Sequence, residues 1–268
     1  MSAFKLALDA GHGYNTAGRR CLAKYDPEQH REWWLNNRIC NYIAERASAY
    51  DGFETYRVDD TTGKTDVALK TRCALANEKG ADLYYSAHHN ADINGGKGGG
   101  VTAYSCPNSS NGRKWRDLLY AAIVEAGDLK GNRSTPKSEV SYYVLKHTTM
   151  PAVLIEHGFM DSSTDIPVII SEDYAKKVGY AVADAIAKEA GLKLKKASTT
   201  PTAKSYKVTI DTDELNVRKD ASASSEVVTV VKRGEVFTIV AEKMNGSTKW
   251  GKLKSGAGWI SLRYTKKI

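Results

Sequence analysis

No stretch of this 268-residue chain approaches the ~18 uninterrupted apolar residues that a membrane-spanning helix needs. A secretory signal peptide is also missing, because charges at Lys5 and Asp9 break the apolar N-terminal run, which instead predicts a core strand over residues 3–8. We therefore expect no membrane span, and synthesis in the cytoplasm without an export signal.

Cysteine is scarce, and its pattern gives no sign of pairing. The four cysteines lie at wide spacings in the first half of the chain, with no Cys-x-x-Cys motif: Cys21, Cys40, Cys73 and Cys106. Because 41% of the residues are hydrophobic and 26% are charged, a core can form without disulfides. We expect four free thiols and synthesis in a reducing compartment.

Acidic residues are few in the C-terminal part of the chain. Residues 196–268 contain 14 Lys and Arg against 7 Asp and Glu, so this part carries +7 of the formal net charge of +8. A basic segment attracts anionic polymers, and salt screens that attraction. No motif of stacking aromatics for nucleotide bases is present, so nucleic acid is the weaker alternative and we expect none as a partner.

Strand-like apolar runs alternate with segments of helical spacing along the first part of the chain. Expected strands cover residues 3–8, 53–58, 81–86, 100–104, 140–145 and 152–155, and expected helices cover residues 32–49, 66–79, 113–127 and 173–190. Asp66 or a neighbour is expected to cap the second helix, and Gly80 to end it. This alternation predicts an α/β domain over residues 1–192, with a mixed sheet flanked by helices.

The composition changes after this domain. Residues 193–205 are rich in Lys, Ala, Ser and Thr with no apolar period, which is typical of a linker. Short alternating strands with close turn signals then fill residues 206–268. They predict a small all-β barrel of the SH3-like kind.

Side chains that can bind metal or transfer protons cluster at the ends of the predicted strands, where sites in such sheets form. His12 lies in the turn after the first strand, His88 follows residues 81–86, and Glu156 ends residues 152–155. Two histidines and one carboxylate such as Glu32 make the ligand set of a catalytic zinc, which keeps a fourth position for water. A further carboxylate, here Glu156, is then available for acid–base work.

Five motifs in order resemble the zinc-dependent N-acetylmuramoyl-L-alanine amidases of the amidase-3 type. They are Asp9-Ala-Gly-His12-Gly13, Glu32 with Asn36, Leu69…Arg72…Ala76-Asn77, Ser86-x-His88-x-Asn90 and Pro151-Ala-Val-Leu-Ile-Glu156-x-Gly-Phe159, and the match covers roughly residues 3–192. The resemblance implies one Zn²⁺ per chain, held by His12, Glu32 and His88, with Glu156 as the catalytic carboxylate. It also implies cleavage of the amide between the lactyl group of N-acetylmuramic acid and the L-alanine of the stem peptide.

Two of these assignments have close competitors. His88 and His89 are adjacent and point to opposite faces of a strand, so only one can bind the metal. The family spacing selects His88 and leaves His89 at the rim or on the second face, where it can touch substrate. Glu28 competes with Glu32 in the same way, and Asn36 favours Glu32. Asn90 is expected to support a metal ligand without binding the metal itself.

Tryptophans adjoin the Glu32 position. Trp33 and Trp34 follow it directly and are first of all packing residues. One of them, Trp33 in particular, is a candidate for the wall of the substrate groove.

The C-terminal segment resembles the bacterial SH3-type cell-wall-binding module. The resemblance is carried by Leu215-Asn-Val-Arg218, Val231-Lys-Arg-Gly-Glu235, Trp250-Gly-Lys-Leu253 and Gly258-Trp-Ile-Ser-Leu262. It implies binding to the bacterial wall, for which Trp250, Trp259 and Tyr264 are candidates. The charge of +7 on residues 196–268 suits an anionic wall polymer such as teichoic acid.

The combination of a peptidoglycan amidase with a wall-binding module resembles a phage endolysin, which reaches the wall after holin-type release or lysis. A host autolysin acting from a lysing mother cell has the same features. A zinc peptidase that cuts a peptide crosslink uses the same chemistry, and a wall-binding protein without activity is a further alternative. The sequence carries no signal for an oligomeric state.

Overall fold

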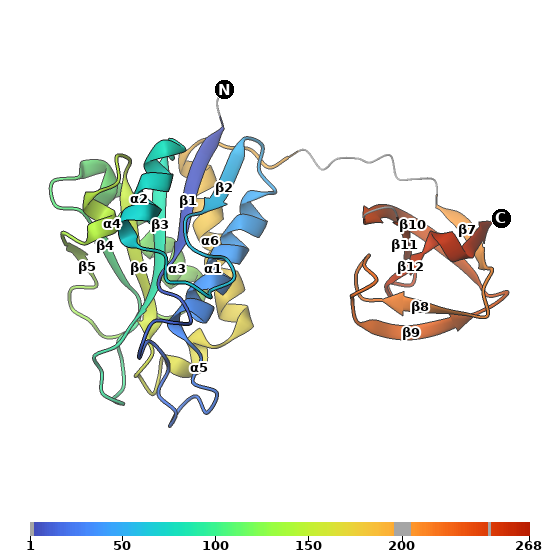
Figure 1. Ribbon diagram of the computed structural model, residues 1–268, viewed down its shortest axis with the longest axis horizontal. Helices are drawn as coiled ribbons and strands as arrows, with labels where there is room; N and C mark the ends of the chain where they lie inside the picture. Colours follow the sequence, from blue (N-terminus) through green and yellow to red (C-terminus); the bar gives the residue numbers. More distant parts are fainter. Residues whose placement is uncertain (1–2, 196–204, 246–247) are drawn as a thin grey trace. The chain divides into compact units, whose positions relative to one another are not determined.

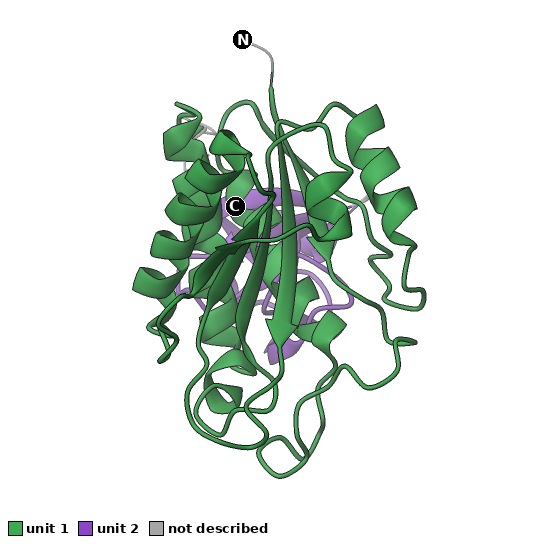
Figure 2. Ribbon diagram, turned by 90° about the vertical axis from the view of Figure 1, so that its left-hand side faces the viewer, with its two compact units in different colours: residues 1–195 green, residues 196–268 purple. Residues whose placement is uncertain are grey.

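The computed structural model describes residues 3–195, 205–245 and 248–268. The chain divides into two compact units, residues 1–195 and residues 196–268, which Figure 2 shows in different colours. Each unit is described here by itself.

A six-stranded mixed sheet forms the centre of the first unit (Figure 1). Its strands lie in the order β2 (Phe53–Arg57), β1 (Phe4–Ala10), β3 (Leu83–Asn90), β6 (Ala152–Phe159), β4 (Thr102–Ser105) and β5 (Lys137–Glu139). All neighbours are parallel except β4 and β6, which pair antiparallel. The three strands β1, β3 and β6 therefore end at the same edge of the sheet, as the sequence predicts.

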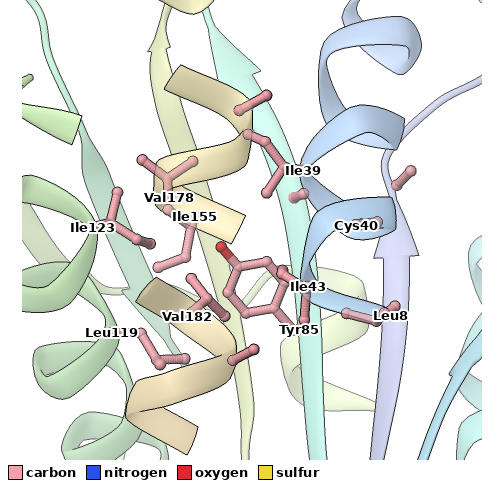
Figure 3. Packing of buried hydrophobic residues seen from close by; sticks show 14 of the residues in the cluster. Leu8, Ile39, Cys40, Ile43, Tyr85, Leu119, Ile123, Ile155, Val178 and Val182 are labelled. Carbon is pink, nitrogen blue, oxygen red and sulfur yellow. The ribbon is translucent and has the colours of Figure 1, made fainter. Parts of the chain in front are cut away.

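Helices cover both faces of this sheet (Figure 2). One face packs against α1 (Glu32–Ala47), α3 (Ser110–Gly127) and α6 (Glu172–Glu189), with α5 (Ile166–Ile169) nearby. Figure 3 shows Ile39, Val178 and Ile123 of these helices packed over Tyr85 and Ile155 of the sheet. On the other face, the described residues place the short helices α2 (Leu69–Glu78) and α4 (Tyr143–Lys146) on a smaller core.

The strand predicted over residues 140–145 is wrong. In the structure β5 ends at Glu139, and α4 begins at Tyr143. The apolar side chains of Val144 and Leu145 are buried together against α2 and the sheet, which a helical turn allows and a continued edge strand does not. Tertiary packing outweighs the β propensity of this segment.

Two helices start at other residues than expected. Asp66 does not cap α2, whose N-cap is Ala68 without a side-chain hydrogen bond. The Asp66 carboxylate instead accepts hydrogen bonds from Thr16 and Arg72. The third helix starts earlier than residue 113, because Ser109 caps it by accepting from the N–H of Gly112.

The second unit is an antiparallel sheet of seven strands around its own small core. The strands are β7 (Tyr206–Ile210), β8 (Glu214–Arg218), β9 (Val227–Lys232), β10 (Val236–Asn245), β11 (Thr248–Leu253), β12 (Trp259–Ser261) and β13 (Thr265–Lys267), with a 3₁₀ turn η1 at Leu262–Tyr264. This confirms the predicted α/β domain followed by an all-β unit of SH3-like type.

Residues 193–195 belong to the first unit. Leu194 forms a β-bridge with Tyr50, and the N–H of Lys195 donates to the carbonyl of Ala49. The first unit thus extends beyond the expected boundary at residue 192. Of the predicted linker, residues 196–204 lie outside the described residues.

All four cysteines are free thiols, as expected, and three of them are buried. Among the helices that the structure describes, none combines the length and the apolarity that crossing a membrane requires.

Candidate active site

The structure brings His12, Glu32 and His88 together at the edge where β1 and β3 end. Their ligand atoms all lie within 4.8 Å of one another. His12 Nε2 is 3.4 Å from Glu32 Oε2, and His88 Nδ1 is 3.0 Å from Glu32 Oε1. Glu32 is the first residue of α1, so the helix presents its carboxylate to both imidazoles.

The turn after β1 can approach His88 because of a glycine. A Cβ added to Gly11 would lie 2.1 Å from the His88 ring, so no larger residue fits there without moving the ring. His12 itself has a φ of +68°, a left-handed conformation that is uncommon outside glycine. The backbone thus bends sharply where the imidazole is presented to Glu32.

Burial alone would raise the pKa of Glu32, but the hydrogen bond and charge of His88, with the charge of His12, lower it overall. Burial opposes the charged form of His88 in turn, yet the hydrogen bond and charge of Glu32 raise its pKa. For His12 burial prevails and the pKa is lowered, although the charge of Glu32 opposes this. The carboxylate is therefore held ionised between the two rings.

The donor set fits a zinc ion. Glu32 Oε2 is buried and has no hydrogen-bond partner among the described residues, an arrangement that is costly for a carboxylate oxygen unless a cation satisfies it. Two imidazole nitrogens and one carboxylate oxygen are ligands that Zn²⁺ accepts, with a position left open. These three residues would hold the metal.

Glu156 lies next to this cluster on β6. It pairs in register with His88 of β3, so both side chains emerge on the face of the sheet that carries α2 and α4. Its Oε2 atom is buried without a partner among the described residues. Burial raises the pKa of Glu156 to about 7, with the Glu32 charge adding to the rise and the charges of His88 and Arg19 opposing it.

A cleft of about 380 Å³ opens beside the two histidines. Its lining includes His12, His88 and the segment Asp66–Leu69 before and at the start of α2. The side chain of Leu69 is about half exposed and forms an apolar edge of the cleft. The cleft therefore opens onto two of the three candidate metal ligands.

Comparison with known proteins identifies the family. Residues 6–188 match the family model of the N-acetylmuramoyl-L-alanine amidases, and residues 213–266 match the model of the bacterial SH3 domain. This chain belongs to that amidase family.

Individual relatives agree with this assignment. The chain is 27% identical over 222 residues to the N-acetylmuramoyl-L-alanine amidase CwlM of Bacillus licheniformis, covering 82% of this chain and 79% of that protein. It is 29% identical over 252 residues to the endolysin of Bacillus phage SPP1, covering 92% and 83%. The crystal structure of an N-acetylmuramoyl-L-alanine amidase from Clostridium difficile 630 superposes with a TM-score of 0.63 at 25% identity, over 71% of this chain and 98% of that one.

In this amidase His89 lies on the second face of the sheet and not at the rim. The side chain is buried, and its Nδ1 contacts Asn36 Oδ1 at 2.7 Å. Only its backbone reaches the site, where the N–H donates to Glu32 Oε1 at 3.2 Å. Asn36 in turn donates to the carbonyl of Gly11, so the pair supports the turn that carries His12.

Other expected residues lie elsewhere. The Glu28 side chain is 79% exposed and pairs with His30, outside the cluster. Trp33 is buried, donates to Asp59 and packs on Tyr14, so the expected position in a substrate groove is wrong. The side chain of Asn90 accepts from the adjacent N–H of Ala91, and the described residues show no contact from it to the ligands.

Asp66 is a neighbour of the site that the sequence did not indicate. Its Oδ2 lies 3.8 Å from His12 Nδ1, on the side of the ring away from Glu32. Arg72 donates to Asp66 Oδ1 at 2.9 Å and to the carbonyl of His12 at 3.2 Å. A carboxylate behind a metal-binding histidine fixes the ring and its tautomer. The only sequence signal was Arg72, which the family pattern contained without a role.

The second unit has a cavity of about 430 Å³ between β8, β11 and η1. Trp250, Tyr264, Arg218 and Arg263 line it, together with Ser261, whose buried hydroxyl has no partner among the described residues. Trp259 does not line this cavity and lies below Lys252. The structure thus brings two of the three wall-binding candidates together.

Proposed function

We propose that this peptidoglycan amidase binds one Zn²⁺ through His12, Glu32 and His88 and uses Glu156 as its acid–base group. The observation that carries the proposal is the convergence of three ligand atoms within 4.8 Å beside a carboxylate in register on the neighbouring strand. When bound, zinc supplies Lewis acidity to the scissile amide carbonyl and to the attacking water.

Glu156 transfers the proton from the water to the leaving amine. Its carboxylate accepts a proton from the water that attacks the carbonyl carbon of the lactyl group, and donates it to the nitrogen of L-alanine as the C–N bond breaks. A pKa raised by burial to about 7 suits both steps near neutral pH. The products are the free lactyl carboxylate of N-acetylmuramic acid and a stem peptide with a new N-terminal alanine.

The bond that is cut can be tested directly. Purified walls are digested, and the new amino termini are identified. Release of N-terminal L-alanine without new amines from crosslink residues supports the amidase reaction. New crosslink amines without N-terminal alanine would instead identify a peptidase that uses the same metal chemistry.

We also propose a lytic role of the phage endolysin type. The similarity to the endolysin of phage SPP1 extends over 92% of this chain, so it includes both units. An enzyme made in the host cytoplasm would then reach the wall after holin-type release or lysis. Expression with and without a holin tests this role. An endolysin should lyse the cells only when the holin is present. A mother-cell autolysin needs no holin, because it is released when the cell that made it lyses.

For the second unit we propose wall binding through the cavity beside Trp250 and Tyr264. Arg218 and Arg263 place positive charge at its walls, and Ser261 offers an unpaired hydroxyl. Anionic wall polymers such as teichoic acid are attracted by the net charge of +7 on residues 196–268.

A further inference from the structure

Arg19 lies beside the proposed active site, on a loop that the backbone holds in place. Its carbonyl accepts a hydrogen bond of 2.9 Å from the N–H of Glu32, the first residue of α1. The side chain of Arg31 holds the same loop, because it donates to the carbonyls of Thr16 and Gly18. The position of Arg19 is therefore fixed relative to Glu32.

The Arg19 guanidinium has unused hydrogen-bond donors. Nη1 lies 3.7 Å from Glu32 Oε2, which is too far for a hydrogen bond. Within the part of the chain that the structure describes, no acceptor takes a hydrogen bond from this side chain, which is about half exposed. An arginine presents five N–H groups in a planar fork that matches two oxygens.

The positive charge of Arg19 reaches other groups of the site as well. Burial lowers the pKa of His12 and the Arg19 charge adds to this effect. Burial raises the pKa of Glu156 and the Arg19 charge opposes it. Arg19 thus lies beside Glu32, and its charge acts on His12 and Glu156, the groups around which the proposed reaction places the scissile amide.

Metal binding changes the partner that Arg19 needs. A divalent cation on the Glu32 carboxylate neutralises the negative charge that attracts the guanidinium. With the Glu32 charge neutralised, the free donors of the Arg19 fork are available to an anionic oxygen of the bound substrate.

We propose that Arg19 binds an anionic oxygen of the substrate, and this inference rests on the amidase function proposed above. Two substrate oxygens have this chemistry. One is the amide carbonyl oxygen, on which negative charge develops as water attacks, and the other is a carboxylate of the stem peptide beyond L-alanine. Binding the first raises kcat, whereas binding the second lowers KM.

The test compares Arg19→Gln, Arg19→Lys and a matched control, Arg20→Gln. The control removes one positive charge from the same loop, at a side chain that contacts only the Gly18 carbonyl among the described residues. With soluble wall fragments we expect Arg19→Gln to lose roughly 10- to 100-fold in kcat/KM, the size of one hydrogen-bonded charge pair. Arg19→Lys should recover part of this, and Arg20→Gln should stay close to wild type.

Two forms of the substrate distinguish between the two candidate oxygens. Fragments are prepared with the stem-peptide carboxylate nearest L-alanine either free or amidated. A loss in kcat with both fragments assigns Arg19 to the amide oxygen. A rise in KM with the free acid alone assigns it to the carboxylate.

A purely structural role of Arg19 predicts different results. If Arg19 only positioned Glu32, Arg19→Gln would weaken zinc binding, measured by competition with a chelator. Removing a cation next to a cation site should instead leave zinc affinity unchanged or raise it. Weaker zinc binding that accounts for the whole loss of activity would overturn the proposal.

A binding experiment keeps the inference separate from the amidase function. Fragment affinity is measured in Glu156→Gln protein, with and without Arg19→Gln. If wild type releases no N-terminal alanine, the proposed amidase reaction fails, while the affinities still test Arg19. Equal affinities and, with active enzyme, equal turnover for Arg19→Gln and Arg20→Gln would refute the role of Arg19.

Discussion

Glu156 and His88 lie directly opposite each other in the register of the parallel strands β6 and β3, so their side chains emerge on the same face of the sheet. This pairing places the carboxylate that we propose as proton acceptor beside an imidazole that we propose as a metal ligand. Rigid strands set the separation, which keeps the geometry independent of substrate. The same pairing allows the roles of the two residues to be tested separately.

Substitution of a zinc ligand should lower zinc binding, whereas substitution of a nearby glutamate outside the cluster should not. Glu32→Gln, His12→Ala and His88→Ala should each lower the zinc content and abolish activity, because each removes one of three protein ligands. Glu28→Gln is the matched control, since its exposed side chain lies outside the cluster. Elemental analysis gives the zinc content, and full occupancy in a His12→Ala, His88→Ala double variant would disprove the ligand assignment.

Glu156→Gln should keep zinc and fold but lose roughly 10²–10⁴ in turnover, the usual contribution of a positioned acid–base group. The amide is similar in size to the carboxylate and cannot accept the proton. Circular dichroism and zinc content are the controls for folding. Turnover within a few-fold of wild type would assign the proton transfer to another residue.

The stability of the metal-free protein should depend on Glu156 and pH. The pKa of this group is raised in the folded state from its ordinary value of 4.5 to about 7, so the folded state favours the protonated form. Its contribution to the free energy of unfolding is therefore complete below pH 4.5 and is lost as the pH rises to about 7. The loss amounts to at most about 3 kcal/mol.

Denaturant unfolding of the chelator-treated protein at several pH values measures this effect. Glu156→Gln does not titrate and should show a smaller decrease between pH 4.5 and 7. Parallel pH profiles for the two proteins would mean that Glu156 has an ordinary pKa when folded.

Asp66→Asn should weaken zinc binding by roughly 10- to 100-fold, as expected for a carboxylate that orients a metal-binding histidine. The change keeps the size of the side chain and removes the charge that faces His12 Nδ1. Asp173→Asn is a suitable control because this carboxylate is exposed and pairs only with Lys177 among the described residues. Equal zinc affinities of the two variants in chelator competition would show that Asp66 stabilises its loop and does not contribute to zinc binding.

The sequence predicted the site where local geometry determines it. Alternation along β3 allowed only one of His88 and His89 to bind a metal, and the family spacing selected His88. Asn36, four residues later on the same helix, favoured Glu32 over Glu28. The sequence could not predict Asp66 or Arg19, because Asp66 meets His12 from 54 residues away and Arg19 depends on the path of an irregular loop. The strand prediction for residues 140–145 was wrong for a related reason, because burial of this segment against α2 favours a helical turn over a strand.

The two units should divide cutting and binding between them. The catalytic candidates all lie in residues 1–195, which carry a net charge of only +1, whereas residues 196–268 carry +7. A fragment ending at Lys195 should still cut soluble wall fragments, because this boundary keeps the bridge between Leu194 and Tyr50. It should bind whole walls poorly.

Residues 206–268 alone should sediment with purified walls without cleaving them. Salt should weaken this binding, since exposed charges are screened over a Debye length of ~8 Å at physiological ionic strength. Contacts in the cavity of Trp250 and Tyr264 should leave a part that resists salt, and Tyr264→Ala should remove that part while Trp259→Ala, outside the cavity, should not. The measurement is sedimentation of each fragment over a salt series. If residues 1–195 sediment as well as the full chain, the second unit is not the anchor, and its charge must serve another purpose.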